Sequence, residues 1–294
     1  MSPSPVVEPI ETTPEPLVEP VETTPSEPHP SNHRGGAEVL GFCQLAFASF
    51  MGAVQPRSAT SGYAEPMNTA IFTGKASAYA AGRPGYPPEA MDYICSLVPA
   101  SAVFADIGAG TGKFTELLAE REYKVFAVEP NADMRAELEK TMAPYQNAKI
   151  VAGTAEMTTL PDDCADVITC AQALHWFDPA TFRAECHRIG KPGALVVSVY
   201  NTTPGGSSLA HCESSTEAFF NNPALREFPN PQFYSRAGWL TYMTSHSHDP
   251  LPSDERYAEH LAEVNAVFDQ ENVGGLLRRD VVTMIYTEPL TEIP

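Results

Sequence analysis

The sequence has few basic residues. Among its 294 residues, 18 are Lys or Arg and 37 are Asp or Glu, which gives a formal net charge of −19 at pH 7. Nucleic acids and anionic membrane surfaces are bound mainly through clustered Lys and Arg side chains. The composition therefore argues against both kinds of partner and favours a small-molecule substrate.

Cysteine pairs and long apolar runs are also missing. No C-x-x-C pair occurs among the six cysteines, which are Cys43, Cys95, Cys164, Cys170, Cys186 and Cys212. This scattered spacing predicts reduced core thiols in a cytoplasmic protein, and no zinc or other metal site. The uncharged stretch 39–54 is shorter than the roughly 20 residues that a membrane-spanning helix needs. We therefore expect no membrane anchor.

The N-terminal part is rich in Pro and Glu. Residues 7–14 read Val-Glu-Pro-Ile-Glu-Thr-Thr-Pro and recur, imperfectly, at 18–25. Dense proline blocks helix formation, and the segment has too few apolar side chains to offset chain entropy. We predict a disordered tail at 1–35, either a tether or a segment with no specific role, and a poorly defined extension at 36–66. The folded domain is expected at 67–294.

Beyond this region, apolar strand patterns alternate with helical patterns. The pattern predicts strands at 124–128, 149–152, 165–171, 194–200 and 281–286, and helices at 89–98, 112–121, 131–143, 179–189 and 254–270. Such alternation is typical of an α/β fold with a parallel sheet. Ligands of such sheets bind where the carboxyl ends of the strands meet. Asp106, Glu129, Gly153 and Gln172 all fall near predicted strand ends, which predicts one shared site.

A glycine-rich turn follows a further apolar strand pattern, which begins at Val103 and ends in Asp106. It reads Asp106-Ile-Gly108-Ala-Gly110-Thr-Gly112. Glycines permit positive φ angles and let a ligand approach the backbone at a helix N-terminus. A dinucleotide fingerprint would need a small residue at 113, where Lys113 stands, and Asp106 would repel a pyrophosphate. Asp106 suits the cationic amine of an amino-acid moiety, and Glu129 suits the hydroxyls of a ribose.

These motifs resemble those of a known family. The turn, the Val128-Glu-Pro-Asn-x-x-Met134 block and the Ala171-Gln-Ala-x-His-Trp-Phe177 block are similar to motifs of class I S-adenosylmethionine-dependent methyltransferases. The last block, with Arg83-Pro-x-Tyr-Pro87, resembles the small-molecule branch that includes trans-aconitate and ubiquinone/menaquinone methyltransferases. The resemblance covers roughly residues 70–290. It implies a Rossmann-like fold whose seven-stranded, mostly parallel sheet has an antiparallel last strand, and methyl transfer to a carboxylate or another O or C acceptor.

The resemblance also implies a site for S-adenosylmethionine, formed by residues around the turn and the strand ends. These are Tyr79, Arg83, Asp106, Gly108, Ala109, Gly110, Gly112, Glu129, Pro130, Met134, Ala155, Glu156, Gln172 and Ala173. Arg83 would clamp the methionine carboxylate. A surface Arg that only fixes the turn at 83–87 is the alternative for that residue.

His175 is the candidate general base, because it follows the fourth strand and has a near-neutral unperturbed pKa. The alternative is that it orients a loop or packs under Trp176. Residues 201–248 lose the alternation and are rich in aromatics. We interpret them as a cap insertion that selects substrate, with Trp176 and Trp239 as candidate substrate contacts, although the aromatics could instead fill a satellite core.

Two other functions remain open from the sequence. One is a binding protein that keeps the cofactor pocket without transferring a methyl group. The other is an NAD-binding protein of Rossmann type, which the acid at 106 and the Lys at 113 make the weaker alternative. The sequence predicts neither the acceptor nor an oligomeric state.

Overall fold

The computed structural model describes residue 76 and residues 82–246 and 249–291. The predicted tail, the extension at 36–66 and Tyr79 lie outside the described residues.

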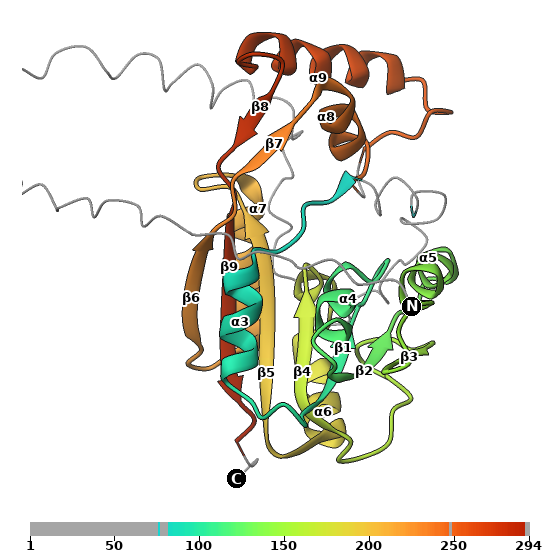
Figure 1. Cartoon of the computed structure of the whole chain (residues 1–294), viewed down its shortest axis with the longest axis vertical. Helices are drawn as coiled ribbons and strands as arrows, with labels where there is room; N and C mark the ends of the chain where they lie inside the picture. The colour runs from blue at the N-terminus through green and yellow to red at the C-terminus, as the bar shows by residue number, and fades with distance from the viewer. Residues whose placement is uncertain (1–75, 77–81, 247–248, 292–294) are drawn as a thin grey trace, which may run out of the picture. The chain divides into compact units, whose positions relative to one another are not determined.

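A seven-stranded sheet forms the centre of the fold, in the order β3-β2-β1-β4-β5-β9-β6. Its strands are β1 (Val103–Ile107), β2 (Lys124–Val128), β3 (Ala148–Val151), β4 (Ala165–Ala171), β5 (Gly190–Thr202), β6 (Ala224–Pro229) and β9 (Val282–Pro289). Strands β1 to β5 pair in parallel, whereas β9 is antiparallel to both β5 and β6. The predicted antiparallel last strand is confirmed (Figure 1).

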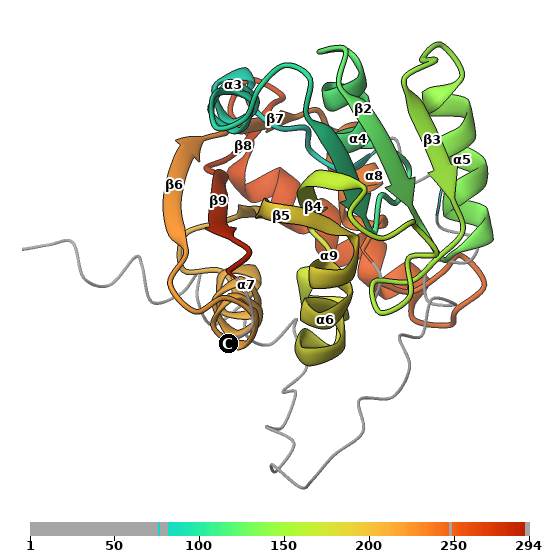
Figure 2. The ribbon, with the colours of Figure 1, turned by 90° about the horizontal axis from the view of Figure 1, so that it is seen from below.

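Helices cover both faces of the sheet, as Figure 2 shows. Helices α3 (Pro88–Ser96), α4 (Lys113–Ala119) and α5 (Ala132–Met142) pack on one face, and α6 (Pro179–Ile189) and α7 (Ser207–Phe219) on the other. The apolar residues of the inner strands are buried on both sides; Phe104, for example, packs with Met91 and Ile94 of α3. This two-sided burial explains why strand patterns such as Val103–Ile107 are almost continuously apolar.

The structure divides the predicted insertion at 201–248 between two places. Helix α7 packs against α6 and β5, and β6 joins the main sheet beside β9. The later part leaves the sheet: β7 (Gln232–Tyr234) and α8 (Arg236–Met243) pack with α9 (Tyr257–Glu271) and β8 (Leu277–Arg279). We call these four elements the satellite lobe, which lies beyond the upper end of the sheet in Figure 1. Its aromatics form a core of their own, as one of the alternatives proposed.

A buried carboxylate fastens the loop after β3 to α6. Glu185 is 8% exposed, and its Oε1 accepts hydrogen bonds from the Thr158 amide at 2.8 Å and the Thr158 hydroxyl at 2.5 Å. Arg188 donates to both oxygens of Glu185, at 2.8 and 2.6 Å. Burial raises the pKa of Glu185, but the bonds from Arg188 and Thr158 outweigh it and lower the pKa from 4.5 to about 2. The ionised form therefore stabilises the fold.

Replacing Glu185 by Gln is expected to lower the free energy of unfolding by about 2 kcal/mol at neutral pH, because it removes charge-assisted hydrogen bonds. The folded pKa of about 2 lies below the unfolded value. This contribution is therefore present above about pH 4.5 and is lost as pH falls toward 2. Urea denaturation between pH 3 and 8 measures it. Glu137→Gln is the control, since its partner Lys140 is 71% exposed; equal losses in the two variants would contradict the interpretation.

Candidate functional site

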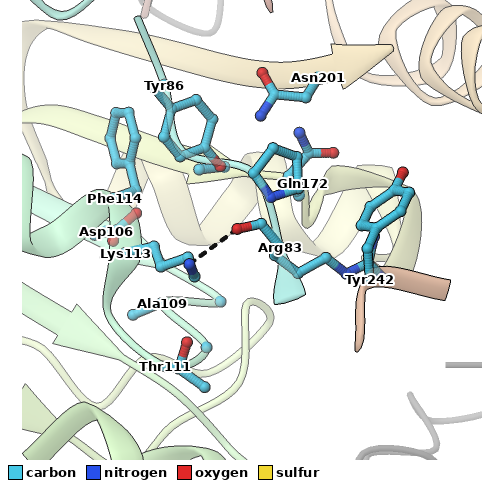
Figure 3. A pocket seen from close by; sticks show the side chains of 14 residues that line it. Arg83, Tyr86, Asp106, Ala109, Thr111, Lys113, Phe114, Gln172, Asn201 and Tyr242 are labelled. Carbon is cyan, nitrogen blue, oxygen red and sulfur yellow. Dashed lines mark hydrogen bonds between the residues drawn. The ribbon is translucent and has the colours of Figure 1, made fainter. Parts of the chain in front are cut away.

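A pocket opens at the carboxyl ends of β1, β4 and β5. Its lining includes the turn after β1, the start of α4 and the side chains of Gln172 and Asn201. Residues 82–87, which we call the strap, cross it and contribute Arg83, Pro84 and Tyr86. Tyr242 enters from α8 of the satellite lobe (Figure 3). This pocket lies at strand ends and includes Asp106 and Gln172, whereas Glu129 and Gly153, which were expected at the same site, are not among the described lining residues.

The glycine-rich turn adopts the backbone conformation for which glycine is needed. Gly108, Gly110 and Gly112 have φ angles of 72°, 57° and 92°. A Cβ on Gly108 would stand 2.8 Å from the Cβ of Ala173, which is closer than real Cβ atoms approach. The amides of Gly108 and Ala109 both donate to the Val128 carbonyl, at 2.9 and 3.0 Å. The turn is therefore fixed between β2 and the segment after β4, and Gly108 and Gly110 contribute to the lining of the pocket.

Asp106 lies at the floor of the pocket and is 1% exposed. Its Oδ2 accepts a hydrogen bond from the Thr115 hydroxyl at 2.6 Å, and its Oδ1 accepts one from the Thr169 hydroxyl at 3.0 Å. Neither partner carries a positive charge. Burial raises the pKa of Asp106 to about 6, although both hydrogen bonds lower it. A cationic group in the pocket would stabilise the ionised carboxylate.

Glu129, at the end of β2, braces the turn. Its Oε2 accepts from the Gly110 amide at 2.9 Å and its Oε1 from the Asn131 amide at 2.8 Å. Burial raises the pKa of Glu129, while these backbone bonds lower it. Glu129 is not among the described residues that line the pocket, but each of its oxygens has a further lone pair. Its predicted contact with a ribose stays a prediction.

Two cations reach the pocket, although the chain as a whole is strongly acidic. Lys113, at the start of α4, donates from Nζ to the Arg83 carbonyl at 2.9 Å, and burial lowers its pKa. In Figure 3 the Arg83 side chain extends away from Lys113 toward Tyr242. Tyr86 packs its ring against Phe114 in a T-shaped contact, with centroids 5.2 Å apart. Arg83 is thus in the pocket, as predicted; its role toward a ligand remains a prediction.

Gln172 has a strained backbone. Its φ is 57°, in the left-handed region that non-glycine residues rarely occupy. Its backbone amide donates to the Val199 carbonyl at 2.8 Å. Such strain persists only where the surrounding structure enforces it, and it is common at functional sites. The side chain lines the pocket (Figure 3), and its predicted contact with a cofactor stays a prediction.

Other residues predicted to bind the cofactor are not among the described residues that line the pocket. Ala155 is buried in the core, and Glu156 accepts a hydrogen bond from the Asp178 amide at 3.1 Å. Ala173 packs against Gly108, and Gly112 precedes α4. Pro130 and Met134 lie at the N-terminus of α5, where the Met134 amide donates to the Asn131 side chain at 3.0 Å. These residues shape the turns around the pocket.

The predicted base and substrate contacts also lie outside the described lining. His175 is exposed on the short 3-10 turn η2 (Leu174–Trp176), with its ring 4.8 Å from that of Trp176. Trp176 packs partly buried on the main core. Trp239 is 3% exposed in the satellite lobe, where its Nε1 donates to the Val264 carbonyl at 2.9 Å. This placement favours the packing alternative for Trp239, and the predicted substrate contact of Trp176 stays a prediction.

Several lining residues were not predicted: Tyr86, Thr111, Lys113, Phe114, Asn201 and Tyr242. The sequence contained a signal that could have identified Lys113 as a lining residue, because it occupies a position where dinucleotide sites need a small residue. Tyr86 lies in the Arg-Pro-Gly-Tyr-Pro segment that carries Arg83. Tyr242 had none, since only the packing of the satellite lobe brings it to the pocket.

The described part of the chain contains no group of three or more His, Cys, Asp or Glu side chains arranged to hold a metal ion. Within that part, no helix is both long and apolar enough to cross a membrane. The five cysteines it includes are free thiols.

Comparison with known proteins identifies the domain. Residues 105–198 match the family described as methyltransferase domain. This segment, which runs from within β1 to within β5, is therefore similar to a methyltransferase domain. An uncharacterised methyltransferase of Mycobacterium bovis is 43% identical over 136 residues, 45% of this chain and 52% of that protein. The ubiquinone biosynthesis O-methyltransferase of Xanthomonas axonopodis pv. citri is 29% identical over 128 residues, 42% of this chain and 54% of that protein.

A solved structure supports the same fold. The structure, assigned as a type II methyltransferase from Anaeromyxobacter dehalogenans, has a TM-score of 0.52 and 23% identity, covering 70% of this chain and 97% of its own. The chain spans about half the length of the curated relatives it matches. The methyltransferase domain contains Asp106, the turn and Gln172, whereas the strap, Asn201 and Tyr242 lie outside the matched residues. The family resemblance seen in the sequence is confirmed for the domain.

Proposed function

We propose that the protein is an S-adenosylmethionine-dependent methyltransferase that acts on a small molecule. The observation that carries this proposal is the Asp106 carboxylate at the floor of the pocket, 1% exposed and bonded only to uncharged hydroxyls among the described residues. A buried carboxylate is costly without a cationic partner. The amine of an amino-acid moiety would supply that cationic partner.

The residues around Asp106 fit the rest of the cofactor. Arg83 and Lys113 supply positive charge for its carboxylate, and the glycine faces of the turn admit the chain between sulfur and amine. The Thr111 hydroxyl, in the same turn, is buried without a hydrogen-bond partner among the described residues. Glu129 has lone pairs left for a ribose. When bound, the cofactor supplies an electrophilic methyl group.

The acceptor side of the pocket is polar but mostly uncharged. Figure 3 places Asn201, Gln172 and Tyr242 on the side away from Phe114 and Asp106. These side chains would orient an acceptor through hydrogen bonds and exclude water, which is the main requirement of an in-line methyl transfer. The small-molecule branch, and His175 as the base for an acceptor that must lose a proton, remain predictions.

Two measurements test the function. Titration calorimetry should show that S-adenosylhomocysteine binds and that NAD does not. Incubation with methyl-labelled cofactor and a panel of carboxylic acids, phenols and amines should then transfer label to one class. Binding of the cofactor without any transfer would favour the alternative of a binding protein, and tight binding of NAD alone would reject the proposal.

Replacing Glu129 by Ala is expected to weaken S-adenosylhomocysteine binding at least about tenfold, because it removes charge-assisted hydrogen bonds. The loss should extend to methylthioadenosine, which carries the ribose but no amino-acid moiety. Glu129→Gln keeps one acceptor oxygen and should lose less. Unchanged calorimetric affinity in Glu129→Ala would reject the ribose contact.

A further inference from the structure

The strap is held over the pocket by side chains rather than by regular structure. Residues 83–87 belong to no helix or strand. The Gly85 carbonyl accepts two hydrogen bonds, from Nδ2 of Asn201 at 3.1 Å and from Nδ2 of Asn230 at 3.0 Å. These donors lie 116 and 145 residues away along the chain. Gly85 stands between Arg83 and Tyr86, both of which line the pocket.

Asn230 is the centre of this network. It lies between β6 and β7, is 9% exposed and is not among the described residues that line the pocket. Besides Gly85, its Nδ2 reaches the Thr283 hydroxyl at 3.1 Å and Oδ1 of Asn201 at 3.3 Å. Its Oδ1 accepts from Nε2 of Gln232 at 2.7 Å. The orientation of the amide is therefore fixed from both ends.

The same network orients Asn201, which does line the pocket. The Thr283 hydroxyl, fully buried in β9, donates to Oδ1 of Asn201 at 2.6 Å. With Oδ1 held by Thr283, Nδ2 of Asn201 must point toward the strap. The strap and Asn201 are thus both held by Asn230 and Thr283. A buried polar network whose hydrogen bonds are satisfied specifies one arrangement.

We propose that Asn230 is a positioning residue of the pocket, which holds the strap and Asn201 in the geometry that binds ligand. The identity of that ligand, the methyl donor, rests on the proposed function. Other contacts also hold the strap: Lys113 bonds to the Arg83 carbonyl, Gly82 lies against the backbone of Thr241, and the Tyr86 ring packs on Phe114. None of these three contacts bonds to the Gly85 carbonyl, which is held by the amide network. Losing this order reduces affinity because the bound arrangement is no longer formed in advance.

Three variants test the proposal. Asn230→Asp keeps the size of the side chain and the oxygen that accepts from Gln232. It replaces the donor Nδ2 by an oxygen, which then faces the three acceptors of that donor on Gly85, Asn201 and Thr283. Thr283→Val keeps the shape and removes only the hydroxyl. The control is Asn147→Ala, since Nδ2 of Asn147 also bonds two backbone carbonyls, those of Ala119 and Tyr123, at 2.9 and 2.8 Å. These carbonyls are outside the described lining of the pocket.

The readouts are calorimetric affinity for S-adenosylhomocysteine, hydrogen exchange of peptides covering residues 82–87, and melting temperature. We expect Asn230→Asp to lose about tenfold in affinity and Thr283→Val about threefold, each with faster exchange in the strap. Asn147→Ala should lower the melting temperature and leave affinity and strap exchange unchanged.

Wild-type affinity and strap exchange in Asn230→Asp would overturn the proposal. If Asn230→Asp does not fold, Thr283→Val decides by the same two readouts. A wild-type protein that binds no S-adenosylhomocysteine would reject the proposed function, and the exchange measurement would then decide by itself whether Asn230 holds the strap.

Discussion

Asp106→Asn is expected to weaken S-adenosylhomocysteine binding by about 100-fold, because a ligand ammonium would lose its only carboxylate partner among the described lining residues. The amide is almost isosteric with the acid and can still exchange hydrogen bonds with Thr115 and Thr169. The loss should therefore come from charge and not from a misfolded turn. The affinity of the wild type for S-adenosylhomocysteine should itself decrease when the pH is lowered below about 6, because ligand-free Asp106 then takes up a proton.

The same variant is expected to be more stable than the wild type without ligand. The pKa of Asp106 rises from 3.8 to about 6 in the folded protein, a difference of about 3 kcal/mol between the two protonation states. Because the folded pKa is raised, the contribution of protonated Asp106 to the free energy of unfolding is fully present below pH 3.8. This contribution is lost as pH rises through about 6. Asp106→Asn should therefore melt higher than the wild type at pH 8, and the two should converge near pH 4.

Calorimetry and thermal melts at pH 4 to 8 measure both effects. Methylthioadenosine, which has no amine, is the control ligand and should bind Asp106→Asn as it binds the wild type. An equal loss of affinity for both ligands would show that Asp106 shapes the pocket and does not meet the amine.

Gly108→Ala is expected to abolish measurable ligand binding and to lower the free energy of unfolding by about 3 kcal/mol. A φ of 72° costs an alanine about 1–2 kcal/mol, and its methyl group would stand 2.8 Å from the Cβ of Ala173 and 3.2 Å from the Phe177 ring. Overpacking of this kind costs about 1–3 kcal/mol. Relief of this collision would displace the turn, whose backbone lines the pocket.

Gly193→Ala is the control that separates the cost of a positive φ from the cost of a steric clash with neighbouring atoms. Gly193 has a φ of 78° and nothing within 4 Å of an added Cβ. Urea denaturation should give about 1 kcal/mol of destabilisation for this control. The double variant Gly108→Ala/Ala173→Gly should recover part of the lost stability, since it removes the nearer contact. Equal destabilisation by Gly108→Ala and Gly193→Ala would contradict the collision with Ala173.

The parallel half of the sheet could be predicted from sequence, because its inner strands β1 and β4 are largely buried and mainly apolar. The strands at 124–128 and 165–171 were predicted with the bounds that the structure gives them. Strand β6 could not be predicted: five of its six residues are exposed at the sheet edge, and Arg226 and Glu227 break any apolar pattern. It was therefore assigned to the insertion.

The candidate site was predictable where one short segment carries it. The glycine turn, Asp106 and Gln172 follow from local chemistry at strand ends. Asn201 directly follows the predicted strand at 194–200 and had the same local signal. Tyr242 could not be found in this way, because long-range packing brings it to the cavity. For the same reason the bond between Asn230 and Gly85, which joins residues 145 positions apart, has no counterpart in local sequence.

The position of β9 between β5 and β6 has a consequence for synthesis of the chain. Strand β6 is made some 50 residues before β9, yet in the described sheet it pairs only with β9. Until β9 leaves the ribosome, β5 presents an unpaired edge whose inner residues, such as Val197 and Val199, are strongly apolar. Such an edge can pair with other chains. The nascent polypeptide is thus most exposed to aggregation just before its sheet is closed.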